Sequence, residues 1–107
     1  MSPAILLALA IATEVFGTSM LRVSDGMSKV VPTTAALTAY AISFYLLAKV
    51  LQHLDVGLTY AIWAGVGTAS IAVIGFMVWD EPMGALKVAS IGAVIVGVIG
   101  LNASGAH

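Results

Sequence analysis

The fold follows from the stretch between Gly57 and Trp79, which reads GLTYAIWAGVGTASIAVIGFMVW and contains no charged residue. A helix that crosses the roughly 30 Å of hydrocarbon in a bilayer needs about 20 predominantly apolar residues, because each residue adds about 1.5 Å. This stretch meets the requirement. Asp80, Glu81 and Pro82 then end it with two charges and a residue that helix interiors exclude. We therefore expect a transmembrane helix here.

Three further segments of the same kind complete the chain. Together with the first, the expected helices cover about residues 3–21, 32–51, 57–79 and 86–103. A transmembrane strand would use about 9–11 residues and alternate apolar with polar side chains, and none of these runs alternates. A helix satisfies its own backbone hydrogen bonds, as lipid requires. The sequence therefore predicts an all-α membrane protein with four transmembrane helices, forming a single transmembrane domain over residues 1–107.

Composition supports a membrane environment and excludes several classes of function. The chain is 61% hydrophobic and 8% charged, with a mean hydropathy of +1.10, whereas soluble domains are about 25% charged. A net charge of −1 gives no electrostatic basis for binding nucleic acid. The chain has no cysteine, and it contains no nucleophile–base pair, phosphate loop or cofactor motif. We expect neither enzyme activity nor a cofactor, and membrane lipid is the expected surrounding.

Glu14 is the most informative residue, because it lies about midway along the first predicted span with apolar residues on both sides. A charged side chain at this depth costs roughly 2.5–3.5 kcal/mol on insertion scales and is usually functional. Hydrocarbon disfavours the ionised carboxylate, so the group can both accept and release a proton. It can also attract a cation, and the two events compete. The structural alternative is a neutral, hydrogen-bonded Glu14.

Helical spacing predicts which residues share the face of Glu14. They are Leu7, Ala10, Ile11, Gly17, Thr18 and Leu21. Ala10 and Gly17 are small, so this face is either a packing seam or the wall of a cavity, and spacing alone does not separate these interpretations.

Aromatic and hydroxyl side chains recur in the second and third spans. Tyr40, Ser43 and Phe44 lie in the second, and Tyr60 and Trp63 in the third. Aromatic rings attract organic cations by roughly 0.5–2 kcal/mol each. The structural alternative for each ring is an ordinary aromatic core or an interfacial belt.

Glycines mark two further features. Gly65 and Gly67 predict either a hinge in the third span or a close helix crossing. Gly92 and Gly97 in the fourth span predict a face for helix association, and hence for dimerisation. The alternative is a plain lipid-facing helix. His53 and His107 have no second ligand at useful spacing, so we expect no metal site.

The basic residues give only a weak preference for one orientation. With four spans, one side of the membrane carries Lys49, and the other carries Arg22, Lys29 and Lys87, an excess of two. Positive charge near the ends of spans sets orientation. The sequence therefore predicts that both orientations coexist.

Two sequence strings resemble the small multidrug resistance family of bacterial transporters, and the resemblance covers essentially the whole chain. They are residues 12–18, ATEVFGT, and residues 57–68, GLTYAIWAGVGT, joined by the loop string SDG at residues 24–26. A lone membrane glutamate is weak evidence, but its combination with the second string is highly specific. Ser90 stands where multidrug members often have glycine.

The resemblance implies an antiparallel, dual-topology homodimer in the inner membrane that exports organic cations in exchange for protons. It implies that Glu14 is the shared site for proton and substrate. It also implies a substrate chamber lined by Trp63, Tyr60 and Tyr40, with Ser43 close to Glu14.

Gly17, Thr18 and Tyr40 resemble the branch that exports quaternary ammonium and other hydrophobic cations. The guanidinium branch usually has a tryptophan where this chain has Phe16. The alternatives are a guanidinium exporter, half of a paired heterodimer, and a non-transporting membrane subunit.

Overall fold

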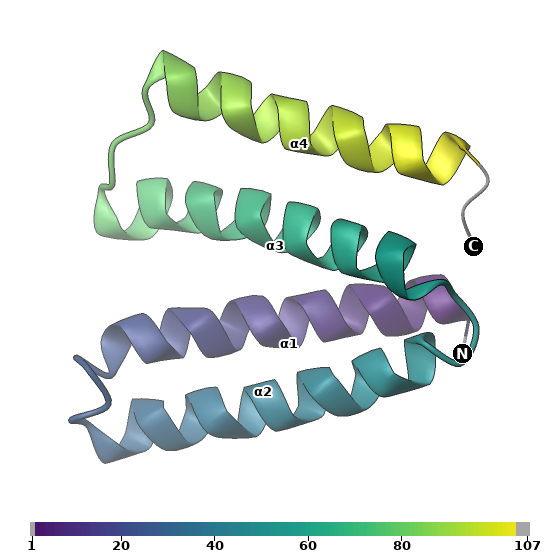
Figure 1. The fold of residues 1–107 in the computed structure, drawn as a ribbon. Coiled ribbons are helices and arrows are strands. Elements are labelled where there is room, and N and C mark those ends of the chain that lie inside the picture. The colour runs from purple at the N-terminus through teal and green to yellow at the C-terminus, as the bar shows by residue number, and fades with distance from the viewer. Residues whose placement is uncertain (1, 105–107) are drawn as a thin grey trace. The chain divides into compact units, whose positions relative to one another are not determined.

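The structure, a computed structural model, describes residues 2–104, and these form four α-helices (Figure 1). They are α1 (Pro3–Val23), α2 (Val30–Val50), α3 (Val56–Trp79) and α4 (Ala85–Ala103). All four are long and apolar enough to cross a membrane. The predicted all-helical fold with four spanning segments is confirmed.

The start of α2 differs by two residues from the expected boundary, since the helix begins at Val30 rather than at Pro32. Pro32 is the third residue of the helix. The first residues of a helix have no intrahelical partner for their N–H groups, so the missing N–H of proline removes no bond there. The C-terminal end of α1 also differs: this helix continues two residues beyond the expected Leu21 and includes Arg22. A basic side chain in the last turn interacts favourably with the negative end of the helix dipole.

Contacts divide the chain into two compact units at residue 53. In the first unit, α1 and α2 form an antiparallel hairpin (Figure 1). Its seam is made of small side chains that are almost completely buried, namely Ala10, Ala36, Ala39 and Ser43. Small residues allow two membrane helices to approach closely, which favours van der Waals contact and interhelical hydrogen bonds.

The loop between α1 and α2 is fixed by Ser24, which is completely buried. Its hydroxyl donates to the carbonyl oxygen of Leu21 at 2.6 Å and accepts from the N–H of Met27 at 3.0 Å. Asp25, Gly26 and Met27 all have positive φ, at 53°, 71° and 68°. Three left-handed residues in succession reverse the chain tightly enough for the helices to pack side by side.

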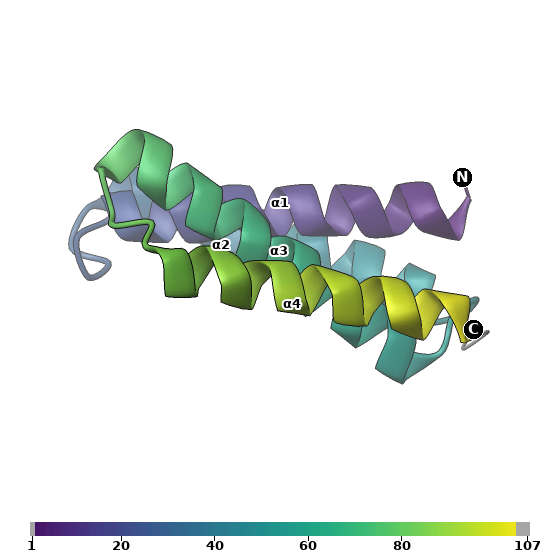
Figure 2. The same cartoon turned by 90° about the horizontal axis from the view of Figure 1, so that it is seen from above.

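In the second unit, α3 and α4 cross at an angle (Figure 2). The crossing lies at Gly65, where an added Cβ would be 2.7 Å from Cγ2 of Val98 and 3.1 Å from Cγ1 of Val94. No residue of α4 is buried. The second unit is therefore packed less tightly than the first.

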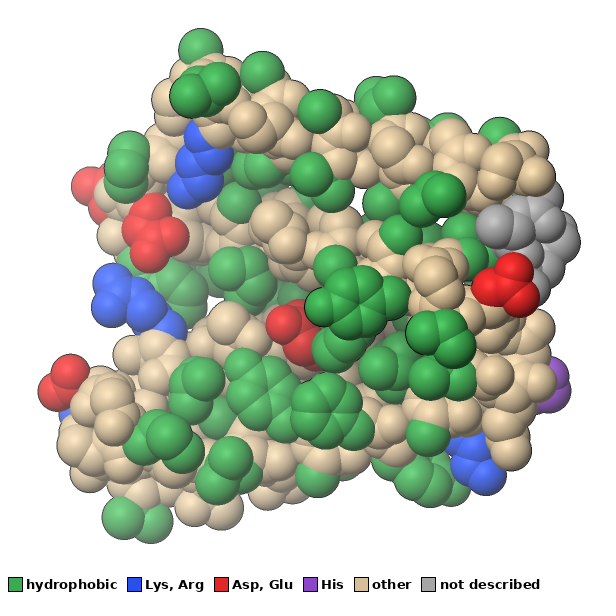
Figure 3. All heavy atoms as spheres, in the orientation of Figure 1, with side chains coloured by type: hydrophobic (Ala, Val, Ile, Leu, Met, Phe, Trp, Pro, Cys, Tyr) green, Lys and Arg blue, Asp and Glu red, His purple; other side chains and the backbone are tan. Residues whose placement is uncertain are grey.

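The end of α3 is closed by Asp80, which adopts a left-handed conformation (φ 54°). The N–H of Glu81 donates to the carbonyl oxygen of Gly75 at 3.1 Å, and the Glu81 side chain folds over that glycine. The sequence indicated only that Asp80, Glu81 and Pro82 end the third span. In the space-filling view, charged side chains gather mostly at the ends of the helices and hydrophobic ones lie between them, as a bilayer requires (Figure 3).

Candidate functional site in the α1–α2 hairpin

Glu14 lies near the middle of α1 and is half-buried. Its Oε1 accepts a hydrogen bond from Oγ1 of Thr18, one turn along the helix, at 3.2 Å. Its Oε2 is buried and has no hydrogen-bond partner among the described residues. An unpaired carboxylate oxygen in an apolar site is unfavourable when it is charged. Within the described residues, this second oxygen therefore lacks the partner that a buried charged atom requires.

A second hydroxyl extends this contact to α2. The oxygen atoms of Thr18 and Tyr40 are 2.7 Å apart. Because the single hydroxyl proton of Thr18 is directed at Glu14, the Tyr40 hydroxyl is the donor in this bond. Gly17 makes the approach possible, since an added Cβ would lie only 3.1 Å from Cε1 of the Tyr40 ring. Three of the residues predicted to surround Glu14 thus form one connected group with it.

Ser43 reaches α1 one turn before Glu14. Its hydroxyl is completely buried and donates to the carbonyl oxygen of Ala10 at 2.7 Å. Oγ1 of Thr13 donates to the same oxygen at 3.0 Å. Ser43 therefore connects α2 to the backbone of α1 beside Glu14. The residues predicted to share the face of Glu14 are all buried or half-buried. These are Leu7, Ala10, Ile11, Gly17, Thr18 and Leu21.

Each unit contains a pair of contacting aromatic side chains. Tyr40 and Phe44 of α2 are stacked, with ring centroids 6.4 Å apart and an interplanar angle of 17°. Tyr60 and Trp63 of α3 meet edge to face at 5.9 Å and 85°. Phe44 and Tyr60 are largely exposed, at 56% and 62%. The α2 pair lies around the middle of its helix and the α3 pair in the first third of its helix. Both pairs present the aromatic surface that an organic cation requires.

The glycines of the second unit occupy different surroundings. Gly65 and Gly67 are both buried in an uninterrupted α3, and Gly65 lies against α4. Gly97 borders a groove of about 550 Å³ between α3 and α4. Gly92 is exposed, and a Cβ added there would meet no atom within 4 Å. The hinge at Gly65 and Gly67 and the dimerisation face at Gly92 and Gly97 stay predictions.

No group of three or more potential metal ligands occurs within residues 2–104. His53 lies in the turn after α2, and His107 lies outside the described residues.

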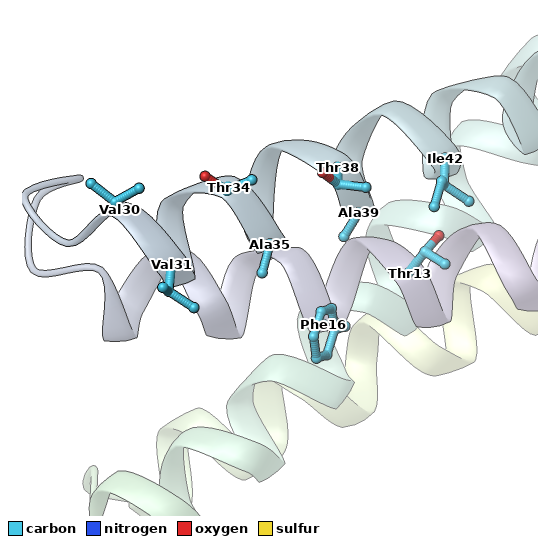
Figure 4. A pocket seen from close by; sticks show the side chains of 9 residues that line it. All are labelled: Thr13, Phe16, Val30, Val31, Thr34, Ala35, Thr38, Ala39 and Ile42. Atoms are coloured by element: carbon cyan, nitrogen blue, oxygen red, sulfur yellow. The ribbon is translucent and has the colours of Figure 1, made fainter.

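The α1–α2 hairpin also has a groove of about 590 Å³ that was not predicted from the sequence (Figure 4). Its lining residues are Thr13, Phe16, Val30, Val31, Thr34, Ala35, Thr38, Ala39 and Ile42. Thr34, Thr38 and Ile42 recur at four-residue spacing, a pattern that places them on one face of α2. That spacing was the available signal, although it does not distinguish a groove from a flat surface.

Comparisons with known proteins agree with this architecture. The profile described as "Small Multidrug Resistance protein" matches residues 3–100. A quaternary ammonium compound-resistance protein, QacC of Staphylococcus aureus, is 40% identical over 96% of each chain. The nicotine metabolites export pump subunit NepA of Paenarthrobacter nicotinovorans is 44% identical over 91% of this chain and 84% of its own length.

The multidrug resistance protein Mmr of Mycobacterium tuberculosis is 37% identical over 92% of each chain. These matches span all four helices and include the segment around Glu14. The chain therefore belongs to the small multidrug resistance family, and it is a multi-pass bacterial membrane protein of a family of efflux transporters, not an enzyme.

Proposed function

We propose that the protein exports hydrophobic and quaternary ammonium cations across the bacterial inner membrane in exchange for protons. Glu14 is the shared site for proton and cation. The observation that carries the proposal is the buried Oε2 of Glu14, which has no hydrogen-bond partner among the described residues. A proton on this oxygen removes the charge, and a bound cation neutralises it, so the two ligands exclude each other.

Exchange follows from that competition. Release of the proton leaves a carboxylate whose Oε1 is stabilised by Thr18, and whose Oε2 is available for a cation. After the protein reverses its facing, a proton arriving from the other side displaces the cation. In a dimer, two copies of Glu14 would face one site.

Substrate selection is assigned to the aromatic side chains. Tyr40, Phe44, Tyr60 and Trp63 offer ring faces and edges, and none of them carries a charge that would bind one cation geometry selectively. Such a lining favours hydrophobic cations of varied shape over a small, strongly hydrated ion such as guanidinium. The name of the 40%-identical relative, a quaternary ammonium compound-resistance protein, supports the same substrate class.

The proposed assembly is an antiparallel homodimer in which the two units of each chain act as a single transmembrane domain. Support comes from the weak excess of basic residues at one end of the spans and from α4, which buries no residue within its own chain. Gly92 and Gly97 are the proposed dimerisation residues, and Gly65 and Gly67 the proposed hinge. One relative is named a pump subunit, so a paired heterodimer is the second candidate, and transport by this chain expressed alone would exclude it.

The test is uptake into proteoliposomes with an imposed pH gradient, using tetraphenylphosphonium, tetramethylammonium and guanidinium as probes. We expect Glu14→Gln to abolish proton-driven transport of every cation, because the amide neither ionises nor accepts a proton near neutral pH. The matched control is Asp55→Asn, which removes the charge of an exposed carboxylate just before α3 and should change transport by less than about two-fold, as expected for a surface site. Proton-driven transport by Glu14→Gln would refute the mechanism, and transport confined to guanidinium would refute the substrate class.

A further inference from the structure

We propose that the groove on the α1–α2 hairpin holds one acyl chain of an anionic phospholipid, with the lipid phosphate at the end of the groove that carries Lys29. The inference does not depend on transport, because none of its steps uses Glu14 or a substrate cation.

The length of the groove matches one leaflet of a bilayer. Along α2 it runs from Val30 to Ile42 (Figure 4), about 18 Å at 1.5 Å per residue. One leaflet contributes about 15 Å of the hydrocarbon thickness. The outer end lies where the α1–α2 loop meets α2. The inner end is bordered by Thr13, the residue before Glu14 and close to the middle of α1.

This length argues against the main competing occupant. A helix of a second chain would cross both leaflets and would need a groove along the whole of α2. The observed groove stops near the middle of the membrane instead, where a lipid tail also ends.

The lining suits a hydrocarbon chain. Apolar side chains make most of it, and the small Ala35 and Ala39 form its floor between the larger Phe16 and Ile42. The hydroxyl of Thr13 is satisfied within α1, since it donates to the carbonyl oxygens of Leu9 and Ala10 at 2.9 Å and 3.0 Å. No buried charge in the lining would oppose an acyl chain.

The charge at the outer end selects the headgroup. Lys29 immediately precedes Val30 and is exposed. Asp25 lies in the same loop, four residues before Lys29. The exposed Lys29 ammonium is the basic group next in the chain to the outer end of the groove. An anionic phosphate is therefore attracted here more strongly than a zwitterionic headgroup.

The experiment is native mass spectrometry of the purified protein in mild detergent. Phosphatidylglycerol and phosphatidylcholine with identical acyl chains are the two probes. Ala35→Phe fills the floor of the groove, and Leu37→Phe is its control, since Leu37 is 53% exposed on the same helix and does not line the groove. Lys29→Gln removes the charge at the mouth, and its control is Lys49→Gln at the opposite end of α2.

We expect Ala35→Phe to lower retention of both lipids by about ten-fold relative to Leu37→Phe, the loss expected when roughly two methylenes leave an apolar contact. Lys29→Gln should reduce the preference for phosphatidylglycerol by about five-fold, with no such change in Lys49→Gln. Circular dichroism verifies that each variant is helical, and Lys29→Gln tests the headgroup without altering the groove.

Two results would overturn the proposal. Equal lipid retention by Ala35→Phe and Leu37→Phe would show that the groove holds no acyl chain. A changed dimer fraction in Ala35→Phe, read from the same spectrum with lipid retention intact, would show that a second chain covers the groove.

Discussion

The substitution Gly17→Ala tests how closely Tyr40 packs against α1. An added Cβ would lie 3.1 Å and 3.2 Å from two atoms of the Tyr40 ring and 3.3 Å from the carbonyl oxygen of Ala36. The methyl group would thus be held between a side chain and a backbone atom, both closer than ordinary contact. Because the backbone of α2 is fixed by its own hydrogen bonds, we expect the ring to move. Its hydroxyl would then leave Thr18, which it now contacts at 2.7 Å.

The expected destabilisation is about 2 kcal/mol. Overpacking of a well-packed position costs typically 1–3 kcal/mol, and loss of the Tyr40–Thr18 hydrogen bond adds about 1 kcal/mol. Against this, alanine is favoured over glycine in a helix by about 1 kcal/mol. The clash and the lost hydrogen bond together therefore outweigh the gain in helix propensity.

The assay is unfolding by sodium dodecyl sulfate in mixed micelles, followed by circular dichroism. Gly57→Ala is the matched control, since nothing lies within 4 Å of its added Cβ, and it should stabilise the protein by up to about 1 kcal/mol. In a Tyr40→Ala background the penalty of Gly17→Ala should largely disappear, as a double-mutant cycle requires for two residues in contact. If Gly17→Ala and Gly57→Ala have the same effect, the packing argument is refuted.

Four further substitutions follow from the same structure. Ser43→Ala should lower unfolding stability by about 1 kcal/mol, because it removes a buried interhelical hydrogen bond, and unchanged stability would contradict that. Gly65→Ala should loosen the α3–α4 crossing and cost about 1–3 kcal/mol, whereas Gly57→Ala, which meets no atom within 4 Å, should not. Trp63→Ala should weaken equilibrium binding of aromatic cations by about 0.5–2 kcal/mol, and an equal loss for tetramethylammonium would argue against ring contact. Met27→Gly should stabilise the α1–α2 loop by about 1 kcal/mol in thermal unfolding, since a left-handed conformation is strained for methionine.

The four helices were predictable because their hydrophobic runs are long and their charged residues lie between them. The sequence does not show which face of each helix packs. Each span is apolar around most of its circumference, so the pattern that separates core from surface in a soluble helix is weak here. Helix ends differed by one or two residues, as at Pro32, where proline is tolerated inside the first turn.

The candidate site was predicted unevenly. Glu14 is recognisable because no other charge lies deep in a span, and helical spacing identifies Thr18 as its neighbour. The acceptor of Ser43 was not predictable, because it is the backbone carbonyl of Ala10, which every residue possesses. The contact of Gly17 with Tyr40 depends on the relative rotation of α1 and α2, which sequence spacing within one helix does not fix.

The contrast between the two hairpins bears on how the protein is made. Every contact that holds α1 to α2, from the alanine seam to the Ser43 bond, lies within the first 53 residues. During synthesis α1 and α2 can enter the bilayer and pack against each other while the ribosome is still translating α3 and α4. In the second pair, α3 and α4, no residue of α4 is buried, so the two helices pack less tightly against each other. We therefore expect this pair to complete its folding only when α4 packs against a neighbouring chain, and to be the slower step in biogenesis.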